Sequence, residues 1–120
     1  MKIRLLAPLC LAIFLLAGCR KVTPTSGQLD KNRYYAVLLN GGQVYFGKLD
    51  GLGTAFPVLT DVFYVQARQD PETKQVTNIL VKRGKEWHAP DRMMINSSQI
   101  VFIEPVTPGS RVADLISSAK

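Results

Sequence analysis

The sequence predicts an all-β protein: a small five-stranded barrel with a short C-terminal helix, preceded by an apolar N-terminal segment. β-rich runs alternate with turns that contain glycine or proline over most of the 120-residue chain. Several runs are apolar on both faces, which a flat sheet with one wet face does not need. Curling the strands into a barrel, with a helix or a partner over part of the outside, buries both faces. The helical pattern lies at the end of the chain, after Ser110.

The N-terminal segment has the organisation of a secretory signal peptide. Two basic residues precede the apolar run Leu5–Ala17, and small residues follow it. The ending Leu16-Ala17-Gly18-Cys19 resembles the lipobox of bacterial lipoproteins. The resemblance implies cleavage between Gly18 and Cys19, attachment of lipid to the Cys19 sulfur, and a membrane as partner through that lipid.

An uncleaved transmembrane helix is the alternative for this segment. Leu5–Ala17 spans 13 residues and contains Pro8, whereas a membrane-spanning helix needs about 20 residues. Arg20 and Lys21 place positive charge on the second flank, so an uncut and inverted segment would leave the domain in the cytoplasm. In the lipoprotein interpretation, Arg20 directly follows the lipidated cysteine. An Asp at that position resembles the inner-membrane retention signal of enterobacteria, and an Arg does not. We therefore expect the protein to be anchored at the periplasmic face of the outer membrane. In an organism without an outer membrane, we expect it at the outer face of the plasma membrane.

Three regions follow: residues 1–18 as signal peptide, 19–32 as a polar lipidated tether, and 33–120 as the β domain with its helix. Without the signal the chain keeps 13 Lys and Arg against 9 Asp and Glu. This mild positive excess suits an anionic membrane surface or an acidic envelope polymer, and it disfavours nucleic acid. The two cysteines, Cys10 and Cys19, leave with the signal or take lipid, so we expect no disulfide in the mature domain.

Two hairpins and a final strand make up the predicted barrel. Tyr34–Leu39 and Gln43–Leu49 flank the turn Asn40-Gly41-Gly42, whose residues accept positive φ. Val58–Gln69 and Gln75–Lys82 flank a turn with Pro71 at its second position. We expect the last strand at Gln99–Glu104, an additional short strand at Met93–Ile95, a tight bend at Gly47, and a helix with Val112, Leu115 and Ile116 on one face.

The first hairpin resembles the opening of small SH3-like barrels of the Sm type. The resemblance covers Val37–Leu49, with Val58–Val62 where the third Sm strand comes and Gln99–Glu104 as the last strand. It implies the barrel shape only, because the Arg-Gly pair of the RNA-binding Sm proteins is absent from that last strand. The chain also resembles a group of uncharacterised short bacterial proteins with an N-terminal apolar segment and a similar core sequence.

The sequence predicts no enzyme, no metal site and no cofactor. His88 is the sole histidine and has no second ligand at metal-binding spacing. Ser97 and Ser98, with His88 and Asp91, lack the spacing of a nucleophilic motif. We expect Asp61, inside an apolar strand, to face solvent or to accept backbone hydrogen bonds; a buried carboxylate with a raised pKa is the alternative.

The densest basic region is the candidate contact surface, for an anionic polymer or an envelope protein. Its residues are Arg83, Lys85, Trp87, His88 and Arg92. A solvated turn is the alternative interpretation. Together with an exposed strand edge that could form a homo-oligomer, these features predict a non-catalytic binding or scaffolding domain in the cell envelope. The alternative is an uncleaved, cytoplasm-facing Sm-like barrel that binds nucleic acid or protein.

Overall fold

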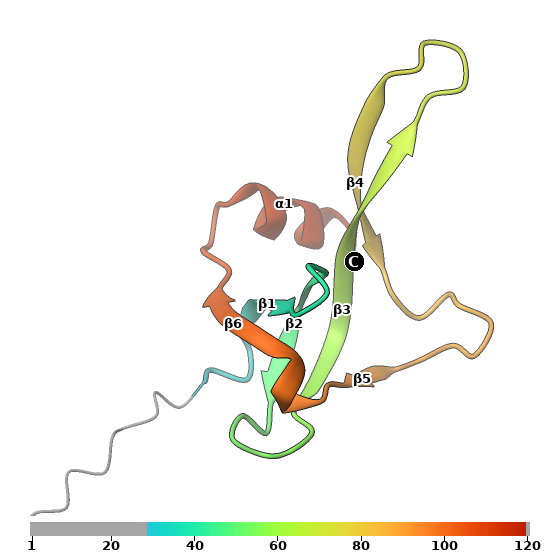
Figure 1. Ribbon diagram of the computed structural model, residues 1–120. Coiled ribbons are helices and arrows are strands. Elements are labelled where there is room, and N and C mark those ends of the chain that lie inside the picture. The colour runs from blue at the N-terminus through green and yellow to red at the C-terminus, as the bar shows by residue number, and fades with distance from the viewer. Residues whose placement is uncertain (1–28, 120) are drawn as a thin grey trace, which may run out of the picture.

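The computed structural model describes residues 29–119 of the protein. The predicted cleavage and lipidation residues Gly18 and Cys19, and most of the tether, lie outside the described residues. The described elements are β1 (Tyr34–Leu39), β2 (Val44–Asp50), β3 (Val58–Gln69), β4 (Val76–Lys82), β5 (Arg92–Met94), the 3₁₀ turn η1 (Ser97–Gln99), β6 (Ile100–Pro105) and α1 (Arg111–Ser118) (Figure 1).

The strands form one antiparallel sheet in the order β4-β3-β2-β1-β6, with β5 paired to β3. The prediction of an all-β domain with a short C-terminal helix is therefore confirmed. The sheet has six strands rather than the predicted five, because the short strand near Met93 is formed. β4 and β6 lie at the two ends of the strand order and do not pair with each other, so the predicted barrel is not closed. The sheet stays open because β3 continues past β2 with β4 alone, which carries β4 away from β6 (Figure 1).

β3 pairs with three other strands, β2, β4 and β5, and its partners change halfway along its length. Val58–Thr60 pairs with β5, whereas Phe63–Gln69 pairs with β4. Between the two segments Asp61 has φ 49°, and the β2–β3 register shifts between Phe46 and Lys48. This is the geometry of a β-bulge, which bends the strand and increases its twist.

Gly47, predicted to mark a bend, lies at this register shift and is buried. A Cβ atom placed there would lie 2.7 Å from Leu59 Cγ and 2.8 Å from the Thr60 carbonyl oxygen. Both separations are well inside van der Waals contact. A glycine is therefore required for β2 to approach β3 this closely.

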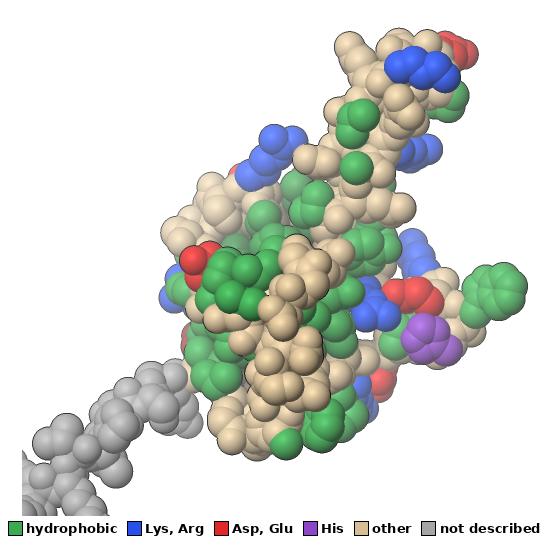
Figure 2. All heavy atoms as spheres, in the orientation of Figure 1, with side chains coloured by type: hydrophobic (Ala, Val, Ile, Leu, Met, Phe, Trp, Pro, Cys, Tyr) green, Lys and Arg blue, Asp and Glu red, His purple; other side chains and the backbone are tan. Residues whose placement is uncertain are grey.

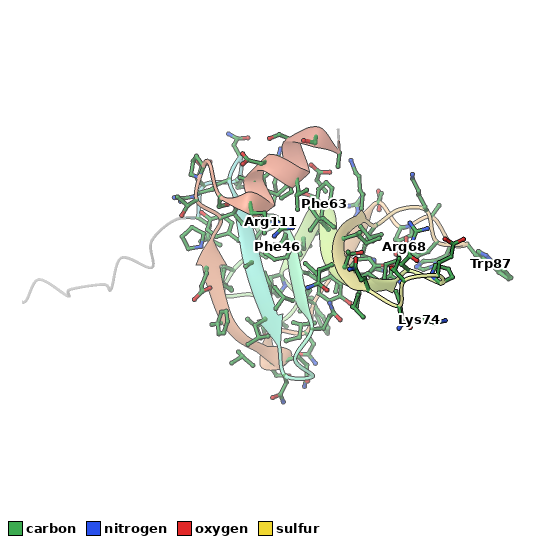
Figure 3. All side chains as sticks on the ribbon, turned by 90° about the horizontal axis from the view of Figure 1, so that it is seen from above. Phe46, Phe63, Arg68, Lys74, Trp87 and Arg111 are labelled. Atoms are coloured by element: carbon green, nitrogen blue, oxygen red, sulfur yellow. The ribbon has the colours of Figure 1, made fainter. Side chains whose placement is uncertain are left out.

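The concave side of the curled sheet holds the main core. Its buried side chains come from β1, β2, β3 and the segment after β5: Tyr35, Val37, Leu49, Leu59, Val62 and Ile95. A second apolar contact covers part of the convex side, where Phe63 and Ile116 of α1 are both buried. Figure 3 shows Phe46 and Phe63 beside α1. The helix thus covers one part of the outer face, as the strands with two apolar faces require.

α1 begins where the sequence predicts. The Ser110 hydroxyl accepts a hydrogen bond from the Ala113 N–H at 3.3 Å, which caps the helix. On its predicted apolar face, Ile116 is buried but Leu115 stays 40% exposed. In residues 29–119 no helix is long and apolar enough to cross a membrane.

The distal half of the β3–β4 hairpin extends beyond the rest of the sheet. We call residues 65–80 the arm and the remaining described residues the body. Val65–Gln69 and Val76–Ile79 are exposed throughout, since only these two strands pair with each other there. Figures 1 and 2 show the arm projecting from the body, and Figure 2 shows hydrophobic side chains on it.

Candidate functional site

The segment between β4 and β5, residues 83–91, forms a loop that is closed by one carboxylate. Arg83 Nε donates to Glu86 Oε1 at 2.8 Å, and the Gly84 N–H donates to Glu86 Oε2 at 2.7 Å. Gly84 has φ 117°, which suits glycine. The hydrogen bond from Arg83, followed by that from Gly84, lowers the pKa of Glu86 to about 2. The loop base is therefore fixed by charge-assisted hydrogen bonds.

Arg83 is turned toward the body and does not present its charge at the loop surface. Its Nη1 donates to Met93 Sδ at 3.2 Å, and its guanidinium carbon lies 5.8 Å from the centre of the Tyr45 ring. Only 22% of the side chain is exposed. Arg83 thus differs from the other predicted contact residues of this loop, because its Nε bonds to Glu86 and its Nη1 bonds to Met93 of β5.

The outer part of the loop presents the other predicted residues of this segment. Trp87 is completely exposed at the loop tip (Figure 3), and Lys85 and His88 are exposed beside it. A tryptophan that residues 29–119 leave uncovered presents a large apolar surface. Lys85, Trp87 and His88 are therefore the predicted contact residues that lie exposed on this loop.

Arg92 lies apart from that tip, on β5, and pairs with its neighbour Asp91 at 2.9 Å. It lines a cleft of about 330 Å³ together with Asp61, Val62, Lys82, Arg83, Pro90, Asp91 and Met93. Three cationic side chains and two carboxylates share this cleft. An anion entering it would meet both signs of charge, so the predicted basic cluster divides into a mixed-charge cleft and an exposed loop tip.

A side-chain network at the β3 bulge is the feature that the sequence analysis missed. The Tyr34 hydroxyl donates to Asp61 Oδ2, and Lys82 Nζ lies 3.0 Å from Asp61 Oδ1. Burial, and then the hydrogen bond to Asp61, raise the pKa of the Tyr34 phenol. Asp61, expected to face solvent or to accept backbone hydrogen bonds, therefore has side-chain partners from β1 and β4 that the sequence did not predict. The only signal was a carboxylate inside an apolar strand, since Tyr34 is 27 residues away in sequence.

Two of the residues weighed for catalysis, Ser98 and Asp91, have side-chain partners close in sequence. Ser98 Oγ donates to Asn96 Oδ1 at 2.9 Å, and the same Asn96 oxygen caps η1. Asp91 is paired with Arg92. Within residues 29–119, no three His, Cys, Asp or Glu side chains gather where they could hold a metal ion.

Comparison with models of known protein families gives no match to this chain. A search of curated proteins also finds no significantly similar sequence.

Proposed function

We propose that this chain is a bacterial lipoprotein whose β domain is a non-catalytic binding or scaffolding module in the cell envelope. The observation that carries the proposal is Leu16-Ala17-Gly18-Cys19 at the end of a short apolar run. Two or three acyl chains on Cys19 would anchor the protein stably, because each buried CH₂ contributes about 0.8 kcal/mol. The polar residues between Cys19 and the domain would act as the tether.

The exposed loop tip supports a binding role for the domain. We propose that Lys85, Trp87 and His88 contact an envelope protein, with Trp87 as the central contact. Tryptophan is enriched among the interface residues that dominate binding energy. An anionic envelope polymer is the less favoured ligand, because Arg83 and Arg92 are engaged by Glu86 and Asp91.

We also propose that the domain is related to small SH3- and Sm-like barrels. The strand order β4-β3-β2-β1-β6, together with the strong bend of β3, supports this relationship. The pairing between the two ends of the sheet would be the part that this chain lacks.

The alternative is an uncleaved anchor that leaves the domain in the cytoplasm, where it binds nucleic acid or protein. Arg20 and Lys21, directly after the apolar segment, favour it. This alternative predicts RNA affinity that falls steeply with salt concentration.

The test of the anchor is the intact mass of the full chain isolated from its own membranes, with Cys19→Ala as the control variant. We expect a mass equal to residues 19–120 plus acyl groups, and loss of that species in the variant. An unmodified 120-residue chain in both samples would contradict the lipoprotein proposal and favour the alternative.

The test of the binding surface is crosslinking in membranes. Trp87→Ala should remove the crosslinked envelope partner. Leu52→Ala, which truncates a 50% exposed apolar side chain in a different loop, should leave it in place. Equal crosslinking by both variants would exclude the loop tip as the contact surface.

A further inference from the structure

The outer edge of β4 has no proline and no bulge, and its charge is confined to its last residue, Lys82. β4 ends the strand path, so no strand among residues 29–119 pairs with its outer side. From Val76 to Val81 it carries no charge and no proline, and its pairing with β3 has no register shift. Charged residues, proline and bulges are the usual means by which proteins prevent pairing at an edge. This edge is therefore open to another strand.

The opposite edge of the sheet, β6, is protected in several ways. It contains Glu104 and ends at Pro105, which has no N–H to donate. Its pairing with β1 shifts register between Leu38 and Leu39. A head-to-tail assembly of β4 on β6 would meet these obstacles, whereas a pairing of β4 with β4 would not.

The hydrogen bonds at both ends of the β3–β4 ladder show which β4 residues point outward. The Arg83 N–H donates to the Val62 carbonyl at 2.8 Å, and the Asp70 N–H donates to the Gln75 carbonyl at 2.8 Å. Hydrogen-bonded pairs alternate along an antiparallel ladder. Because Gln75 and Arg83 are in hydrogen-bonded pairs, the backbone groups of Thr77, Ile79 and Val81 also bond to β3. The N–H and C=O groups that face outward are those of Val76, Asn78, Leu80 and Lys82.

We propose that a second copy of this chain occupies the edge, with the two β4 strands antiparallel about a twofold axis at Ile79. This register places Asn78 opposite the partner's Leu80, and Val76 opposite the partner's Lys82. All four outward-facing residues then pair, and no like charges stand opposite one another. The strand is thus complementary to itself in a single register.

The exposed apolar side chains of the arm also fit this occupant. Val65 is 44% exposed, Val76 65% and Ile79 36%. A two-stranded ribbon is only marginally stable by itself in water, and pairing would turn two arms into a four-stranded sheet. A groove of about 460 Å³ between the arm and α1, lined by Val65, Leu80 and Leu115 among others, lies next to the new sheet. The dimer goes beyond the proposed function and does not require lipidation, although confinement to a membrane would favour it.

The test uses residue 79, because it faces itself across the proposed axis. The full chain in detergent should be a dimer by light scattering. Ile79→Lys alone and Ile79→Glu alone should each be monomeric, because like charges then lie opposite each other. An equimolar mixture of the two variants should restore a dimer that contains one copy of each. Thr77→Lys, on the same face of β4 but opposite the partner's Val81, should remain dimeric.

A disulfide tests the register independently. Residues opposite each other in a non-hydrogen-bonded pair have Cα atoms about 4.5 Å apart, within the range for a disulfide. Ile79→Cys should therefore form an intermolecular crosslink above the background of the parent chain, and Thr77→Cys should not. A monomeric parent chain, a dimer unaffected by Ile79→Lys, or a mixture that stays monomeric would each overturn the proposal. A monomeric parent chain would instead favour pairing of the β4 edge with a strand from a different protein.

Discussion

The two halves of β3 have the same strand conformation but different surroundings. In the body, Leu59 is fully buried where β3 pairs with both β2 and β5, and Phe63 is fully buried beside α1 (Figure 3). In the arm every residue from Val65 to Gln69 is exposed. Burial along this strand follows the elements that flank it: Val62 in the body is 5% exposed, whereas Val65 in the arm is 44% exposed. The body holds the buried apolar core that stabilises the domain, whereas the arm leaves apolar side chains and the β4 edge exposed.

The largest expected effect is at Phe63. Phe63→Ala removes a fully buried ring between the sheet and α1, and should reduce the free energy of unfolding by about 3–5 kcal/mol. Val65→Ala truncates the next residue on the same face, now in the arm, and should cost less than about 1 kcal/mol. Urea denaturation of the monomeric protein measures both. Similar losses would contradict the division into body and arm.

The second effect concerns the close approach of β2 and β3. Gly47→Ala would place a methyl group 2.7 Å from Leu59 Cγ, and should destabilise the domain by about 1–3 kcal/mol. Gly41→Ala is the matched control, because no atom lies within 4 Å of a Cβ at that position. The control should change stability by no more than about 0.5 kcal/mol. Thermal unfolding of both variants checks the difference.

Much of this fold could be predicted because its local signals agree with its tertiary structure. The Asn40-Gly41-Gly42 turn, the β-rich runs of β1 and β3, and the cap at Ser110 each depend on residues close in sequence. The open sheet could not be predicted, because it depends on where β3 stops pairing with β2. That point is set by contacts between distant segments and leaves no local mark.

The candidate site was harder to predict than the fold, for a related reason. Arg83, Lys85 and Trp87 are close in sequence, which suggested one shared surface. Glu86 turns Arg83 inward while the loop turns Trp87 outward, and the sequence does not specify that choice. The network of Tyr34, Asp61 and Lys82 joins three strands, so its members could not be matched from their spacing.

The third effect tests that network through pH. Tyr34→Phe removes the hydroxyl that donates to Asp61, and should cost about 0.5–1.5 kcal/mol at neutral pH. The pKa of Tyr34 in the folded state is raised above its ordinary value of 10.0. The folded state thus favours the neutral phenol, so this stabilisation is present below pH 10 and is lost as the pH rises further. The parent should lose stability more steeply than Tyr34→Phe above pH 10; parallel curves would exclude the effect.

The smallest effect is confined to the loop that carries Trp87. Because the pKa of Glu86 is lowered from 4.5 to about 2, its contribution to loop order is present above pH 4.5 and is lost as the pH falls toward 2. Trp87 is the sole tryptophan, so its fluorescence anisotropy reports on this loop. The anisotropy should fall over that pH range in the parent, whereas Glu86→Gln should give a curve with no such transition.

Amide hydrogen exchange on the full chain in detergent, at several protein concentrations, is the most direct test of the division into a stable body and a pairing arm. The amide of Leu59, between β2 and β5 in the body, should be protected at every concentration. The outward-facing amides of Asn78 and Leu80 should exchange freely in dilute samples and become protected as concentration rises. Free exchange at Asn78 and Leu80 at all concentrations, or protection there equal to that of Leu59 at all concentrations, would contradict the account.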